Sequence, residues 1–130
     1  MTPEERELLL QDLSARLPYG VICLVEFSDD RKYAAKLTSV SVTSLGFGSS
    51  GVAYLHCCKP YLRPMSSMTE EEDHEFALLQ VQGGIDECKY LYACDAANMI
   101  TWLNRHHFDY CNLIEKGLAL PALEGMYKTK

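Results

Sequence analysis

The pattern of apolar and polar residues near the N-terminus predicts an amphipathic helix from Pro3 to Leu17. Its apolar stripe is made of leucines at helical spacing, namely Leu9, Leu10, Leu13 and Leu17. Thr2 and Glu5 form a T-x-x-E capping box, which satisfies backbone N–H groups at the start of a helix. Asp12 and Arg16 lie one turn apart, and we expect both on the side of the helix that faces solvent.

The segment after this helix alternates with a period of two, which is typical of strands. Residues 19–27 are apolar on both faces and predict a central strand, while the polar residues 28–32 predict a hairpin loop. Residues 33–38 predict the returning strand. The apolar positions change phase near Thr43, so we expect a bulge or a turn there. Residues 52–58 predict a further strand.

A punctuated segment leads from these strands into a second helix. Pro60 and Pro64 favour an extended, non-helical backbone. Thr69 and Glu72 then form a second capping box, which predicts a helix from Glu70 to about Val81. The side chains expected to point from this helix to the core are those of Phe76, Leu78 and Leu79.

A third helix is predicted near the C-terminal end. Two glycines, Gly83 and Gly84, end the preceding helix, and the residues Tyr90–Tyr92 favour a strand. Asp95 then suits the cap of a helix from about Ala96 to His107. Its predicted inner face carries Ala96, Met99, Ile100, Leu103 and His107. A short turn should follow and end at Gly117.

These elements predict an α+β fold in a single globular domain spanning residues 1–130. It comprises an N-terminal helix, a small antiparallel sheet or SH3-like barrel of about four strands, and two to three C-terminal helices. The chain has 130 residues, of which 48% are hydrophobic and 23% charged, and these values are typical of one globular domain.

The composition also predicts a cytoplasmic location. The chain has no apolar run long enough for a membrane span, and its acidic N-terminus lacks the apolar core of a signal peptide. We therefore expect the six cysteines to stay reduced, and a disulfide framework is the less favoured alternative.

The net charge of −6 is unevenly distributed. Seven of the 18 acidic residues lie between Glu70 and Glu87, where there is no lysine or arginine. Such a segment is either a solvated helix start or a surface for a basic partner. Direct nucleic-acid binding is disfavoured, because it depends mainly on basic residues. The residues predicted for an interaction surface are Tyr61, Arg63, Glu70, Glu71 and Asp73.

The segment Gly46–Gly51 matches the G-x-G-x-x-G motif of dinucleotide-binding proteins. That motif requires a following helix, whose N-terminus meets the pyrophosphate. Here the next residues, Val52–Leu55, are strand-like, so we interpret the glycines as a hairpin turn.

The spacing of Cys88, Cys94, His107 and Cys111 is similar to that of a zinc finger, but its first gap is too long. A strand between Cys88 and Cys94 would hold them about 20 Å apart, too far to share an ion. His106 or His107 beside Cys111 suggests a nucleophile and its base, but no activating group can be assigned from spacing. We therefore predict no catalytic residue, no metal and no cofactor, and whether the cysteines and His107 meet stays open.

Four segments carry a resemblance to a known family: Leu17–Val21, Lys59–Glu71, Trp102–Tyr110 and Leu113–Leu120. They resemble small uncharacterised proteins encoded by gut Bacteroidales and their phages or mobile elements. The resemblance covers about a third of the chain. It implies an intracellular accessory protein of a bacterial host and carries over no catalytic residues.

The leading functional prediction is a non-enzymatic intracellular binding protein of phage or mobile-element origin that engages a host protein. One alternative is a protein that binds or sequesters a nucleotide, with the glycine segment and Arg63 near the phosphate. Another is a small metal-dependent hydrolase built on the segment from His107 to Cys111. A homo-oligomer is compatible with each of these functions, and the sequence does not identify the partner.

Overall fold

The first helix, α1 (Pro3–Arg16), begins as the sequence predicts. The Glu5 N–H donates to Thr2 Oγ1 at 3.1 Å, and the Thr2 N–H donates to Glu5 Oε1 at 2.9 Å, which completes the capping box. The leucine stripe packs into the core, with Leu9 and Leu13 fully buried. The computed structural model describes residues 1–82 and 89–127.

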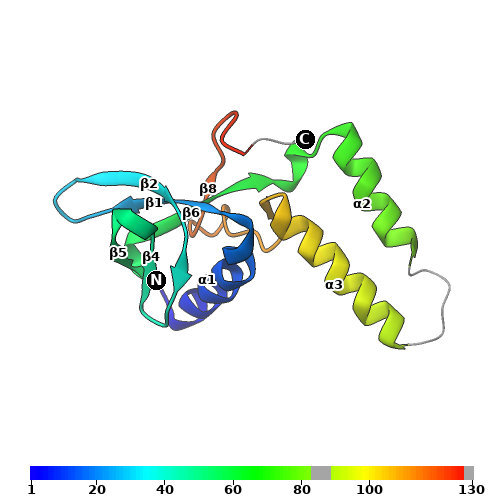
Figure 1. Cartoon of the computed structure of the whole chain (residues 1–130), viewed down its shortest axis with the longest axis horizontal. Coiled ribbons are helices and arrows are strands. Elements are labelled where there is room, and N and C mark those ends of the chain that lie inside the picture. The colour runs from blue at the N-terminus through cyan, green and yellow to red at the C-terminus, as the bar shows by residue number, and fades with distance from the viewer. Residues whose placement is uncertain (83–88, 128–130) are drawn as a thin grey trace.

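The larger sheet has the strand order β2-β1-β6-β7, and β8 also pairs with β6. The strands are β1 (Ile22–Glu26), β2 (Lys32–Lys36), β6 (Cys58–Pro64), β7 (Phe108–Asp109) and β8 (Leu120–Pro121). β1 and β2 form the expected antiparallel hairpin, whereas β7 and β8 pair with β6 in parallel. The two prolines therefore lie in an extended strand. β6 ties the N-terminal half of the chain to the C-terminal segment (Figure 1).

A smaller antiparallel sheet contains β3 (Ser39–Val40), β4 (Ser44–Gly46) and β5 (Val52–Tyr54). The expected change of phase near Thr43 is the turn between β3 and β4. The predicted strand over residues 52–58 is wrong in extent, because a 3₁₀ turn at Leu55–Cys57 separates β5 from β6. This turn moves the chain from one sheet to the other. In the described part of the chain the strands form two open sheets and do not close into a barrel.

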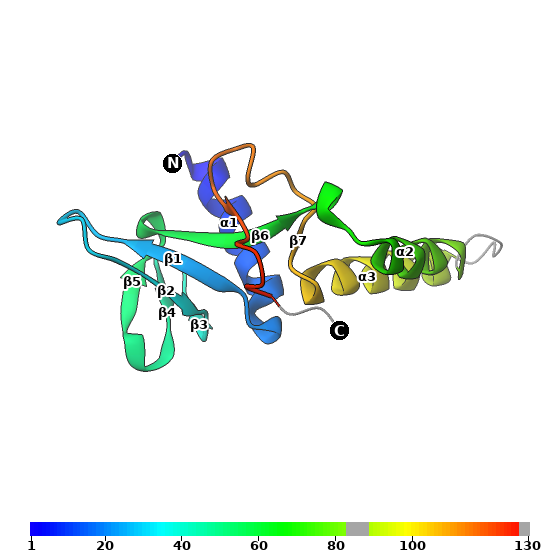
Figure 2. The same ribbon diagram turned by 90° about the horizontal axis from the view of Figure 1, so that it is seen from above.

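The main core lies where α1 meets the two sheets (Figure 2). Its fully buried members include Leu9 of α1, Val25 of β1 and Leu45 of β4, together with Leu113 beyond β7. The expectation that Asp12 and Arg16 face solvent is wrong, because both are buried, with 4% and 0% of their surface exposed. The chain that follows β7 covers this side of α1 and encloses the pair.

The helices α2 (Glu70–Gln82) and α3 (Lys89–Arg105) lie side by side and extend away from the sheets (Figures 1 and 2). The predicted strand at Tyr90–Tyr92 is wrong, since these residues belong to α3. Tyrosine and leucine alternate there over too few residues to separate a strand from a helix, and the following alanine-rich run favours the helix.

A second, smaller core lies at the base of this helical pair. Trp102, Leu103 and Phe108 are buried there, and Phe76 and Leu79 of α2 pack against them. Leu78 and Ile100 were expected on the inner faces but are 50% and 45% exposed. Ala96 is also exposed. A pair of helices without a third layer covers only one side of each helix, so its other apolar residues face solvent.

Among residues 1–82 and 89–127, no helix combines the length and the apolar character that a membrane crossing requires.

Candidate functional site

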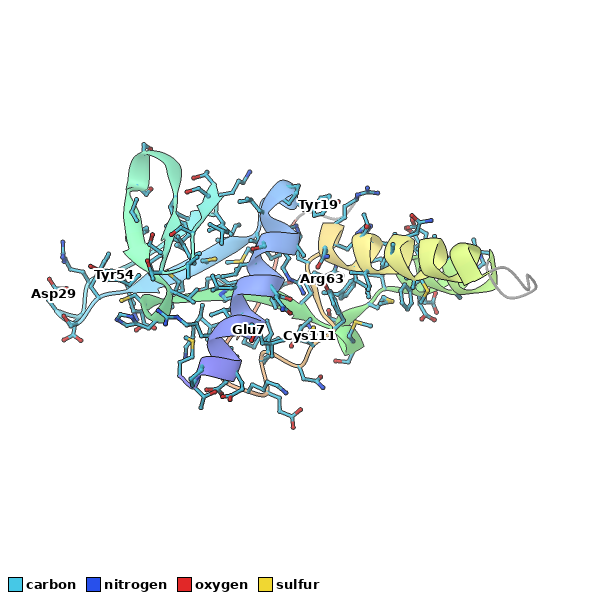
Figure 3. The ribbon with its side chains drawn as sticks, turned by 90° about the horizontal axis from the view of Figure 1, so that it is seen from below. Glu7, Tyr19, Asp29, Tyr54, Arg63 and Cys111 are labelled. Atoms are coloured by element: carbon cyan, nitrogen blue, oxygen red, sulfur yellow. The ribbon has the colours of Figure 1, made fainter. Side chains whose placement is uncertain are left out.

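Arg63 lies where β6 meets the base of the helical pair, and its guanidinium binds Glu72 of α2 (Figure 3). Its Nη1 donates to Glu72 Oε2 at 2.7 Å and its Nη2 donates to Glu72 Oε1 at 2.6 Å. The guanidinium carbon also lies 4.2 Å from the centre of the Phe108 ring. A planar, two-bonded pair of this kind fixes orientation as well as distance. Arg63 thus connects β6, α2 and β7.

Glu72 has two tasks at the start of α2. Its Oε1 accepts the Thr69 N–H at 3.0 Å, and its own N–H donates to Thr69 Oγ1 at 3.1 Å, so the second predicted capping box is confirmed. The bonds from Arg63, followed by the backbone bond from Thr69, lower the pKa of Glu72 to about 2. Glu72 therefore stays ionised over the physiological range and holds the first turn of α2 against β6.

The remaining acidic residues of this turn point outward. Glu72, Phe76 and Leu79 follow the spacing i, i+4 and i+7 and form the inner face of α2. The exposed side chains on the rest of this stretch include four carboxylates, those of Glu70, Glu71, Asp73 and Glu75. This set is called the acidic face below. Of the predicted surface residues, the structure therefore places Glu70, Glu71 and Asp73 together.

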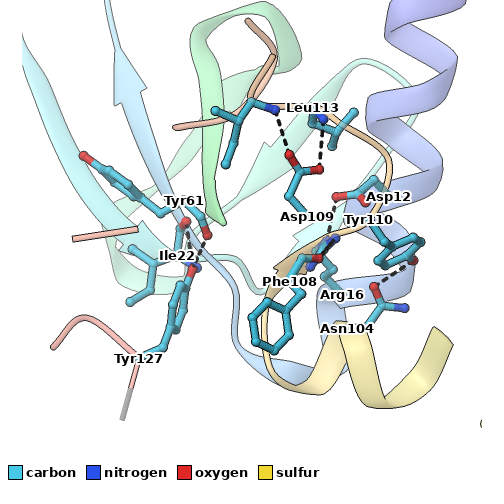
Figure 4. A network of polar contacts seen from close by, with 11 residues as sticks. Asp12, Arg16, Ile22, Tyr61, Asn104, Phe108, Asp109, Tyr110, Leu113 and Tyr127 are labelled. Atoms are coloured by element: carbon cyan, nitrogen blue, oxygen red, sulfur yellow. Dashed lines mark hydrogen bonds and ion pairs between the residues drawn. The ribbon is translucent and has the colours of Figure 1, made fainter. Parts of the chain in front are cut away.

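Arg63 and Tyr61 differ from those three residues. The Arg63 side chain is only 12% exposed and is held by Glu72. Tyr61 is half-buried on β6, and its carbonyl accepts the Tyr127 hydroxyl at 2.8 Å (Figure 4). Both residues consequently support the fold beside the acidic face and do not extend it.

His106 lies beside the same junction. Its ring centre is 4.3 Å from that of Trp102, and its Nδ1 is 3.7 Å from Glu72 Oε2. Burial lowers the pKa of His106, although the charge of Glu72 opposes the shift. His106 is therefore neutral near pH 7 and acts as a packing side chain on Trp102.

The buried pair of Asp12 and Arg16 is a feature that sequence reasoning missed. Arg16 Nε donates to Asp12 Oδ2 at 2.7 Å, and Arg16 Nη2 donates to the Phe108 carbonyl at 2.6 Å (Figure 4). Burial raises the pKa of Asp12, and the bond from Arg16 opposes this rise. The spacing i, i+4 allows the two side chains to pair, but the sequence predicted a pair on the solvent-facing side of the helix, which is wrong for this pair. Its burial depends on residues more than 90 positions away, which no local pattern reveals.

Asp109 supports the backbone next to this pair. Its Oδ1 accepts the Leu113 N–H at 2.9 Å and its Oδ2 accepts the Ile114 N–H at 3.0 Å (Figure 4). Tyr110 donates its hydroxyl to Asn104 Oδ1 at 2.9 Å, which joins the same segment to the end of α3. These contacts order the turn that the sequence predicts before Gly117.

Cys58, Cys111 and His107 are held in states that oppose nucleophilic catalysis. Burial raises the pKa of the Cys111 thiol and raises that of Cys58 to about 12. Burial, helped by the charges of Arg16 and Arg63, lowers the pKa of His107 to about 4. A reactive cysteine needs the opposite arrangement, a thiolate beside a cation.

His107 lies two residues beyond the end of α3 at Arg105, whereas the sequence predicted a helix to about His107. It adopts a left-handed φ of 65°, and its ring stacks on that of Tyr127 with centres 3.7 Å apart. Cys88 and the side chain of Cys94 lie outside the described residues, and so does any contact between these two cysteines and His107 or Cys111. Within the described part of the chain, no three His, Cys, Asp or Glu side chains are grouped as a metal site requires.

The glycine segment Gly46–Gly51 forms the hairpin between β4 and β5, as expected. Several of its N–H groups donate within the protein: Phe47 to the Gly51 carbonyl at 2.8 Å, Gly48 to Thr38 Oγ1 at 2.8 Å and Gly51 to the Gly48 carbonyl at 3.2 Å. A phosphate cradle requires such donors to point at the ligand. The hairpin therefore lacks the arrangement of a nucleotide loop.

Comparison of the chain with models of protein families gives no match, and no curated protein or solved structure matches it either.

Proposed function

We propose that this chain is a non-enzymatic binding protein whose acidic face docks a basic surface of another protein. The observation that carries the proposal is that the helix bearing this face is fixed to the rest of the protein. Glu70, Glu71, Asp73 and Glu75 are exposed on the first two turns of a helix that Arg63 and Glu72 fix to the sheet. Carboxylates held on a rigid element lose little freedom on binding, which favours association.

The other charged and nucleophilic groups support the same proposal. Arg63 and Arg16 are engaged by Glu72 and Asp12 inside the protein. Burial holds the thiols of Cys58 and Cys111 in the protonated form. The acidic face is thus the part of the described chain where several charges of one sign are presented to solvent without partners in the fold.

The expected origin and location belong to this proposal. We place the protein in the cytoplasm of a bacterial host, as an accessory factor of a phage or mobile element that engages a host protein. The free thiols of Cys23, Cys57, Cys58 and Cys111 support a reducing compartment.

Capture from a bacterial lysate tests the proposal. Immobilised protein is compared with the triple variant Glu70→Lys, Glu71→Lys, Asp73→Lys, and recovered proteins are quantified by mass spectrometry. We expect the variant to lose at least about tenfold of a partner that wild type retains, because like charges then face each other. Equal recovery by both proteins would contradict the proposal.

The matched control is the triple variant Glu7→Lys, Glu115→Lys, Glu124→Lys, which has the same net charge and alters exposed residues elsewhere. It should capture the partner as wild type does. A lysine in the first turn of α2 interacts unfavourably with the helix dipole, and each one should lower the stability of the helix by about 0.3–1 kcal/mol. Thermal unfolding of both variants therefore accompanies the capture, and both should remain folded.

A further inference from the structure

The outer edge of β5 carries unpaired backbone groups. The Leu55 N–H donates to the Thr43 carbonyl at 3.1 Å, and the Phe47 N–H donates to the Gly51 carbonyl at 2.8 Å. Since ladder bonds alternate along an antiparallel strand, the N–H and C=O groups of Val52 and Tyr54 point away from β4. The Tyr54 carbonyl accepts the Cys58 thiol at 3.4 Å, so the groups left for another strand are the Val52 N–H, the Val52 C=O and the Tyr54 N–H. Within residues 1–82 and 89–127, no strand pairs with that edge.

This edge differs from the edge formed by β2. There the side chains of Lys32 and Lys36 are exposed, and edge lysines oppose the addition of another strand. At β5 the side chains are uncharged, and Val52 and Tyr54 are 69% and 65% exposed. The edge of β2 is thus protected by charge, whereas the edge of β5 is uncharged and apolar.

A hollow of about 580 Å³ lies beside the edge of β5. Its lining comprises the residues of β5, Thr43 and Ser44 around the start of β4, Phe27 and Ser28 beyond the end of β1, and His56 and Cys57 of the 3₁₀ turn. Asp and Glu, Lys and Arg are missing from the lining, so the hollow matches an uncharged occupant. Its volume lies in the range of about 300–1,000 Å³ that is usual for binding sites.

From these observations we propose that the β5 edge binds an extended, uncharged segment of another protein, which adds as a strand beside Val52–Tyr54. The Val52 N–H, the Val52 C=O and the Tyr54 N–H can pair only with an extended backbone, and the hollow accepts the apolar side chains of that segment. This surface is separate from the acidic face. Figure 3 shows Tyr54 near Asp29, at the end of the molecule opposite to α2 and α3.

The probe for this surface is a phage-displayed library of random linear peptides, selected on the full-length protein. We expect the selected peptides to alternate apolar and small residues. Bound peptide should slow hydrogen exchange at the amides of Val52 and Tyr54, which have no partner among residues 1–82 and 89–127. Selected peptides that leave these two amides unchanged would overturn the proposal, as would a library without binders.

Tyr54→Pro separates backbone pairing from side-chain contact. Tyr54 has φ −69° and ψ 148°, which proline adopts without strain, and its N–H is not bonded to β4. The variant should bind a selected peptide about tenfold more weakly than Tyr54→Ala, which keeps the N–H. Equal affinities of these two variants would contradict a strand added at this edge.

Two further measurements keep the proposal falsifiable. If Tyr54→Pro does not fold, Val52→Lys takes its place and should abolish peptide binding by adding an edge charge. The acidic-face triple variant should bind the peptide as wild type does, so failure here is distinct from failure of the proposed function. Protein that dimerises alone through the same amides would show that the occupant is a second copy and overturn the proposal.

Discussion

At the residue scale, the Asp12–Arg16 pair illustrates the cost of burying charge. Both side chains are almost fully buried, and Asp12 Oδ1 and Arg16 Nη1 have no hydrogen-bond partner within the described chain. A buried pair is costly to break because the remaining charge stays in a poorly solvating environment. The contribution of each of these two residues to stability therefore depends strongly on the presence of the other.

We expect Arg16→Met to lower the free energy of unfolding by about 3–5 kcal/mol, because Asp12 then lacks its partner. The double variant Asp12→Leu, Arg16→Met removes both charges and should be more stable than Arg16→Met alone. Urea unfolding of the four proteins in this cycle measures both values. A double variant no more stable than the single one would show that the loss comes from packing and from the freed Phe108 carbonyl.

His107 should make the protein sensitive to mild acid. Its pKa is about 4 in the folded protein, against an ordinary value of 6.5, so the folded state excludes a proton that the unfolded chain binds. Stability should therefore be full above about pH 6.5 and fall as the pH drops towards 4, by roughly 1–3 kcal/mol.

The variant His107→Asn tests this pH dependence, since asparagine tolerates the left-handed backbone at this position. Denaturant unfolding is measured at several pH values for both proteins. The variant should lose most of the slope between pH 6.5 and 4. It should keep the share of His106, whose pKa burial also lowers, and the later loss from Glu72, whose pKa is about 2. An unchanged slope between pH 6.5 and 4 would assign the acid sensitivity to other groups.

At the element scale, capping governs where the acidic face begins. Thr69 and Glu72 close the first turn of α2, as Thr2 and Glu5 close that of α1. Thr69→Ala should lower the free energy of unfolding by about 1 kcal/mol and speed hydrogen exchange in the first turn of α2. The matched variant Thr2→Ala should do the same in α1 and leave α2 unchanged. Exchange in α2 that is insensitive to Thr69 would show that Arg63 alone fixes this turn.

Local patterns predicted the starts of α1 and α2 well. The predicted start of the third helix is wrong, because α3 begins at Lys89 and Asp95 lies inside it instead of capping it. The outer faces of several elements also differ from the prediction. The capping boxes are confirmed because both partners lie within four residues. The division of residues 52–58 between two sheets depends on pairings with β4 and β1, which lie elsewhere in the chain. The exposure of Leu78 and Ile100 likewise follows from a helical pair with no third layer.

At the scale of the whole molecule, two surfaces lie at opposite ends (Figures 1 and 3). The acidic face belongs to the helical pair, and the β5 edge belongs to the smaller sheet. The sequence predicted Glu70, Glu71 and Asp73 as surface residues, together with Tyr61 and Arg63, which support the fold. It missed the second surface, because an open edge is visible only once the strands are paired. Partner binding at the acidic face should weaken as salt is raised, whereas peptide binding at β5 should not.

Partner binding through the acidic face is tested most directly by zero-length carbodiimide cross-linking of the captured complex, with the cross-linked residues identified by mass spectrometry. This reagent joins a carboxylate to a lysine only where the two are in contact. If the partner binds the acidic face, we expect cross-links from Glu70, Glu71, Asp73 or Glu75 of this protein to lysines of the partner. Cross-links confined to other exposed carboxylates, such as Glu7 or Glu115, would contradict binding through the acidic face.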